Sequence, residues 1–169
     1  MGGSFSCLVD SVGSSGEVVG VEISPEVTTN ARRRIERNSW RNVRVIEAPA
    51  QSADLTNLFD GLLMFAAPDV YASEEALANI LPRLRDNARI VFFGAKTSSR
   101  RAGMFLNPLL RRAFSTLSFP TTPGPEPEPW RRVAPHLERL EIEDLFLGAM
   151  FLASGTYIRE RGSAAGPPG

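Results

Sequence analysis

The sequence is poor in the residues that form disulfides and bind metals. Among its 169 residues it has one cysteine, Cys7, and one histidine, His136. A single cysteine cannot form an internal disulfide, and these two side chains cannot supply the ligands of the usual zinc sites. The sequence therefore excludes a disulfide-stabilised domain and a cysteine- or histidine-rich metal site. We expect no metal, and we predict that Cys7 is buried on a helix.

Net charge and long apolar runs are also lacking. The 19 basic and 19 acidic residues cancel, so no overall field attracts nucleic acid or an anionic membrane. No apolar run reaches the roughly 18 residues of a membrane helix, and no signal peptide is recognisable. We therefore expect a cytoplasmic protein with no membrane span and no nucleic-acid partner. Lys96 is the only lysine among the 19 basic residues, which we interpret as codon bias.

The most informative segment present is a strand that ends in an acid. Residues 17–23 are mostly β-branched and apolar, which predicts a buried strand, and Ser24 and Pro25 are typical of a helix N-terminus. A carboxylate beyond the carboxyl end of a parallel strand can accept two hydrogen bonds from a ribose diol. Glu22 therefore predicts a nucleoside site. The alternative is a solvated acid at the end of a strand.

Strands and helices alternate along the first 95 residues, which predicts a parallel α/β sheet with right-handed crossovers. Further strands are predicted at 43–48, 59–65 and 89–94, with a turn at Asp86 and Asn87 before the last of them. Helices are predicted at 3–12, from Pro25 onward and at 73–84, with a short helical turn near 52–57.

The last third of the chain has a different character. A helix is predicted at 105–117, a proline-rich loop at 119–129 and a helical stretch at 130–136. Two apolar runs around Gly148, at 140–143 and 150–158, predict an antiparallel hairpin. We expect one domain at 1–160 and a disordered tail at 161–169, which is rich in glycine, proline and alanine.

Three segments resemble class I S-adenosylmethionine-dependent methyltransferases. Val18–Pro25 resembles the second strand of the family, whose terminal acid binds the ribose of the cofactor. Phe59–Leu63 is similar to its fourth strand, and Leu84–Val91 to the turn into its fifth strand. The resemblance implies a Rossmann-like, mostly parallel sheet closed by a C-terminal antiparallel hairpin. It implies S-adenosyl-L-methionine as the cofactor.

The sequence departs from the family in three places. The first strand and the D-x-G-x-G-x-G loop of the family are missing, and Gly2 aligns best with the last glycine of that loop. Pro49 stands where the family often has an acid that binds the adenine amino group. Asn87 and Ala88 replace a pair of glycines, a mild change because asparagine tolerates a left-handed conformation.

The resemblance also implies positions for the ligands, without identifying a catalytic residue. His136 is a possible general base, although a lone histidine fits a surface or packing role equally. Asp60 is expected to be a structural turn residue. The candidate substrate contacts are Asp69, Phe119 and Trp130, with capping or packing as the alternative roles. The candidate cofactor-binding residues are Gly2, Glu22, Ile23, Ala48, Pro49 and Ala66.

The sequence leaves three functions open. The first is methyl transfer from S-adenosylmethionine to a small-molecule or lipid-like acceptor. The second is a truncated, catalytically inactive methyltransferase-like protein, because the first strand and the glycine loop are missing. The third is an NAD-binding domain, for which Glu22 would suit the ribose but the glycine fingerprint is also lacking.

Overall fold

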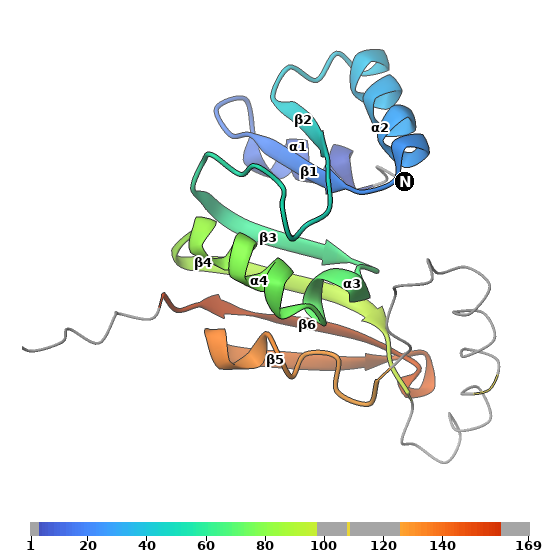
Figure 1. Ribbon diagram of the computed structural model, residues 1–169, viewed down its shortest axis with the longest axis vertical. Coiled ribbons are helices and arrows are strands. Elements are labelled where there is room, and N and C mark those ends of the chain that lie inside the picture. Colours follow the sequence, from blue (N-terminus) through green and yellow to red (C-terminus); the bar gives the residue numbers. More distant parts are fainter. Residues whose placement is uncertain (1–3, 98–107, 109–125, 160–169) are drawn as a thin grey trace, which may run out of the picture. The chain divides into compact units, whose positions relative to one another are not determined.

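The computed structural model describes residues 4–97, 108 and 126–159 (Figure 1). The chain divides into two compact units, Met1–Leu55 and Thr56–Gly169, and each is described by itself. Gly2, Phe119, the predicted helix at 105–117 apart from Pro108, most of the proline-rich loop and the tail at 161–169 lie outside the described residues. Within the described residues, no helix has the length and apolarity needed to cross a membrane.

The first unit packs two helices with a two-stranded parallel sheet. Its elements are α1 (Phe5–Val12), β1 (Val18–Glu22), α2 (Pro25–Arg37) and β2 (Val43–Glu47), and β1 pairs with β2. A small core forms where Phe5 of α1 meets Val18 and Val43. Gly20 makes room for this contact, because a Cβ there would lie 3.2 Å from the Phe5 ring.

Two predictions of burial in the first unit are wrong. Cys7 is exposed, because α1 turns the face that carries Phe5 toward β1 and Cys7 lies off that face. In β1 only Val18 is fully buried, and the other four residues of the strand are half-buried.

The start of α2 confirms the predicted cap. Ser24 is extended, and its Oγ accepts a hydrogen bond from the Val27 N–H at 3.4 Å. We expect Ser24→Ala to lower the free energy of unfolding by about 1 kcal/mol, because the N–H group loses its partner. Urea unfolding, followed by Trp40 fluorescence in a Trp130→Phe background, would measure this. Thr29→Ala, at an exposed position on the same helix, is the control and should change stability by less than about 0.5 kcal/mol.

The second unit contains a four-stranded mixed sheet in the order β3-β4-β6-β5, with helices on one face (Figure 1). β3 and β4 are parallel, and β6 runs antiparallel to both β4 and β5. The predicted C-terminal hairpin is therefore confirmed. The elements are β3 (Phe59–Phe65), α3 (Pro68–Tyr71), α4 (Glu74–Ile80), β4 (Leu84–Ala95), β5 (Leu137–Leu145) and β6 (Met150–Tyr157).

Several boundaries in this unit differ from the predictions. The helix predicted to reach Leu84 ends at Ile80, because Pro82 lacks an N–H and the chain continues as a 3-10 turn, Leu81–Arg83. β4 begins at Leu84 and contains Asn87 in a left-handed conformation, with φ 66°. No helix forms near 52–57, where the chain is irregular after a turn at 50–52. Within the predicted helical stretch 130–136 only Ala134–His136 forms a 3-10 helix.

The core of the second unit is aromatic. Phe92 of β4 and Phe151 of β6 are fully buried, with ring centroids 5.7 Å apart. Tyr71 lies 5.9 Å from Phe151, and Trp130 lies 5.5 Å from it. Leu77 and Leu81 add the helical side of the same core.

Candidate functional site

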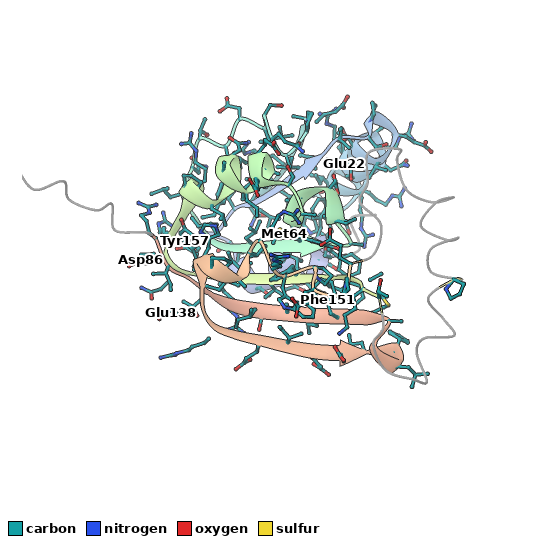
Figure 2. The ribbon with its side chains drawn as sticks, turned by 60° about the horizontal axis from the view of Figure 1, so that its bottom comes forward. Glu22, Met64, Asp86, Glu138, Phe151 and Tyr157 are labelled. Atoms are coloured by element: carbon teal, nitrogen blue, oxygen red, sulfur yellow. The ribbon has the colours of Figure 1, made fainter. Side chains whose placement is uncertain are left out.

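Glu22 stands at the end of β1 with its carboxylate held in place (Figure 2). Its Oε1 accepts a hydrogen bond from the Ser24 N–H at 2.9 Å. This bond forms because the strand ends and the α2 cap begins within two residues, so the backbone N–H points back at the acid. Ser24 N–H is the one partner of the carboxylate among the described residues. Oε2 therefore remains able to accept a hydrogen bond from a ligand.

The predicted cofactor residues of the first unit gather at one edge of its sheet. Glu22 lies opposite Glu47 in the parallel register, and the Ala48 N–H donates to the Glu22 carbonyl at 3.1 Å. Ile23 and Pro49 follow directly, and both are exposed. The Ile23 side chain is 51% exposed and is not part of the core.

The two carboxylates at this edge, those of Glu22 and Glu47, have different partners. Glu47 pairs with Arg32 of α2 at 3.4 Å, whereas Glu22 is held by a backbone N–H. Pro49 presents no side-chain acceptor, and its carbonyl accepts from the Ser52 N–H at 3.0 Å in a turn. The edge thus offers a carboxylate for a diol and an exposed aliphatic side chain for a flat ring.

In the second unit, the chain leaves β3 through a strained residue. Ala66 has φ 51°, a left-handed conformation that is uncommon without glycine, and its N–H donates to the Phe93 carbonyl at 2.8 Å. Strain of this kind concentrates at functional sites. Asp69 follows in the first turn of α3, where its negative charge interacts favourably with the positive end of the helix dipole.

Trp130 packs in the core of the second unit, which is the alternative role that the sequence offered. Its ring contacts Phe151, and the ammonium of Lys96 lies 5.2 Å from the ring centroid. His136 is half-buried, and its backbone groups bond to Val133 and Ile158. Asp60 is paired with Arg85 at 2.6 Å on the surface, which agrees with a structural role.

The sequence missed a buried ion pair at the carboxyl end of β4. Lys96 is 7% exposed, and its Nζ lies 2.6 Å from Oδ1 of Asp144 on β5. The signal in the sequence was the isolation of this lysine among arginines, which was attributed to codon usage. Tyr71 was missed as well. Burial, then the carboxylates of Asp69 and Glu126, raise the pKa of its phenol well above the ordinary value, so it stays protonated.

No group of three or more histidine, cysteine, aspartate or glutamate side chains among the described residues could hold a metal ion. No protein-family model matches the sequence. No curated protein matches it either.

Solved structures, however, share the fold. A SAM-dependent methyltransferase from Aquifex aeolicus matches with a TM-score of 0.59 at 14% identity, over 91% of this chain and 76% of that one. The PH0226 protein from Pyrococcus horikoshii OT3 matches with a TM-score of 0.65 at 16% identity, over 92% and 77%. The N-methyltransferase NodS from Bradyrhizobium japonicum WM9, in complex with S-adenosyl-L-homocysteine, matches with a TM-score of 0.58 at 14% identity, over 83% and 66%.

These likenesses show the fold: the chain has the Rossmann-like fold of SAM-dependent methyltransferases. The mixed sheet with its antiparallel hairpin agrees with it.

Proposed function

We propose that this chain binds S-adenosyl-L-methionine and transfers its methyl group to a small-molecule or lipid-like acceptor. The observation that carries the proposal is Glu22, placed at the end of a parallel strand with its carboxylate oriented by the Ser24 N–H. Neighbours of the same fold are SAM-dependent methyltransferases, and one of them was solved with S-adenosyl-L-homocysteine.

The residues of the first unit fit part of the cofactor. Glu22 would accept the ribose hydroxyls, and Ile23 would pack against the adenine, with Ala48 and Pro49 beside it. Gly2 and Ala66 remain the other proposed cofactor contacts, and Asp69, Phe119 and Trp130 the proposed acceptor contacts. The bound cofactor supplies an activated methyl group on a sulfonium. The protein then mainly has to hold the acceptor in line with that methyl group, which does not demand a nucleophile–base pair.

The other candidate is a chain that keeps the fold but does not bind the cofactor. One feature favours it: Pro49 offers no side-chain acceptor to an adenine amino group. An NAD-binding domain is the weaker alternative, because the neighbours of this fold are SAM-dependent methyltransferases.

Calorimetric titration with S-adenosylmethionine tests the proposal. We expect micromolar binding by the full chain and a loss of about 10- to 100-fold in affinity for Glu22→Ala, because charge-assisted hydrogen bonds to the ribose disappear. Glu22→Gln keeps an acceptor for the Ser24 N–H and should still bind more weakly. Glu26→Ala, in the exposed first turn of α2, is the control and should bind normally. Absence of heat from a folded sample would refute the proposal in favour of the inactive alternative.

A further inference from the structure

The basic residues of the chain are distributed unevenly. Six of the 19 are arginines within residues 32–44, where Glu36 is the one acid. A net charge of zero excludes an overall field, but salt screens exposed charges beyond about 10 Å, so a local cluster acts on its surroundings by itself. This cluster belongs to the first unit, on the C-terminal half of α2, the turn that follows it and the start of β2.

Two of the six arginines have a carboxylate partner. Arg32 pairs with Glu47 at 3.4 Å, and Arg44 pairs with Glu17 at 2.8 Å. Among the described residues no carboxylate forms an ion pair with the other four, which we name the basic patch: Arg33, Arg34, Arg37 and Arg41. Four positive charges of the cluster are therefore available to a ligand.

The basic patch faces solvent. Arg33, Arg37 and Arg41 are exposed, and Arg34 is half-buried. The opposite side of α2, which carries Ala31 and Ile35, packs in the core of the first unit. The Arg33 guanidinium donates a long hydrogen bond of 3.5 Å to the Asn30 amide oxygen, which does not neutralise its charge. The patch is therefore a surface that a large ligand can reach.

Helix stability explains only part of the basic patch. Cations in the last turn of a helix interact favourably with its dipole, and Arg34 and Arg37 hold such positions. However, Arg33 and Arg37 stand at i,i+4, and Arg34 and Arg37 at i,i+3, where like charges destabilise a helix. Glu36 offsets one positive charge of this turn. The remaining repulsion is one that an anionic ligand would relieve.

The composition of the patch favours a ligand with repeated phosphate groups. A guanidinium forms bidentate hydrogen bonds with phosphate oxygens. None of the four arginines is buried, so they do not enclose a single small anion. A membrane surface is poorly suited, because the apolar side of α2 is already packed in the core and cannot enter the lipid. Duplex nucleic acid carries one negative charge per about 1.7 Å of its axis, which suits a surface of several cations.

We propose that the basic patch binds the phosphate backbone of a nucleic acid without reading its sequence. Contacts to the backbone position a protein and carry no sequence information. Trp40, the aromatic residue next to Arg41, is half-buried and packs edge-on against Phe5 with ring centroids 6.4 Å apart, so it does not offer a free face to a base. The patch lies at the C-terminal end of α2, whereas Glu22 precedes the N-terminal end of this helix (Figure 1). The inference therefore does not rest on the proposed function.

Fluorescence anisotropy on the full chain, without the cofactor, measures the binding. The probe is a fluorescein-labelled DNA duplex of about 20 base pairs, titrated at several salt concentrations. We expect a Kd of about 1–100 μM, and a slope of about −3 to −4 for the logarithm of the association constant against the logarithm of the salt concentration, because about four phosphates are neutralised. Arg33→Gln/Arg37→Gln should weaken binding at least about 10-fold and make the slope shallower by about 2.

The matched control is Arg83→Gln/Arg131→Gln, which removes the same charge from two exposed arginines of the second unit and should bind the duplex as the wild type does. Glutamine is a good helix former, and Arg41→Gln, outside the helix, should weaken binding in the same direction without touching α2. A wild type that does not bind the duplex, or a control that loses as much affinity as Arg33→Gln/Arg37→Gln, would overturn the inference. Arginine-dependent binding to phosphatidylserine vesicles without binding to the duplex would overturn it in favour of a membrane surface.

Discussion

Replacing Phe151 by alanine is expected to lower the free energy of unfolding of the second unit by about 3–5 kcal/mol. The side chain is fully buried in the middle of the sheet, and three other aromatic rings surround it, those of Tyr71, Phe92 and Trp130. Removing it leaves a cavity that the neighbouring rigid rings cannot fill. Since small domains are stable by only about 5–15 kcal/mol, this is a large fraction of the total.

Urea unfolding followed by Trp130 fluorescence in the Trp40→Phe background would measure the effect, because Trp130 contacts Phe151 directly. Phe146→Ala is a matched control: the same substitution at a residue that is 72% exposed should change stability by less than about 0.5 kcal/mol. Equal effects of the two substitutions would show that the second unit is not packed around Phe151.

The elements that sequence predicted best are those with a strong local signal. The strand at 59–65 and the hairpin around Gly148 are present, because both are predicted from short apolar runs bounded by turn residues. The cap at Ser24 is present because a serine side chain can accept a hydrogen bond from the first turn of a helix, and proline is favoured at the first helical position. The left-handed Asn87 also matches its residue type.

The errors occur where packing outweighs local pattern. The helix at 73–84 stops at Ile80, because Leu81–Arg83 tighten into a 3-10 turn and Leu84 joins the sheet. Cys7 is apolar enough for a core, but the face of α1 that β1 accepts is set by Phe5. In neither case does the sequence pattern show which neighbour will be available.

The residues of the candidate site show the same difference between what local sequence predicts and what tertiary packing decides. The position of Glu22 at a strand end could be predicted from sequence because the strand end and the helix cap are adjacent, and the Ser24 N–H donates a hydrogen bond to the acid. The Lys96–Asp144 pair could not, because its two residues come together only when β5 pairs beside β6 and β6 beside β4. Rarity of a residue type was the sole signal, and rarity does not say what the residue contacts.

Lys96→Met is expected to lower the free energy of unfolding by about 3 kcal/mol, because it breaks an ion pair in which the Lys96 ammonium is buried and lies 2.6 Å from the Asp144 carboxylate. Urea unfolding of the variant and the wild type, followed by Trp130 fluorescence in the Trp40→Phe background, would measure the effect.

The control is Arg85→Met. Arg85 and Asp60 are also 2.6 Å apart, but their side chains are 51% and 82% exposed, so solvent screens the pair and its loss should cost under about 1 kcal/mol. If Lys96→Met lowers the free energy of unfolding by no more than Arg85→Met does, burial does not increase the contribution of the Lys96 pair to stability.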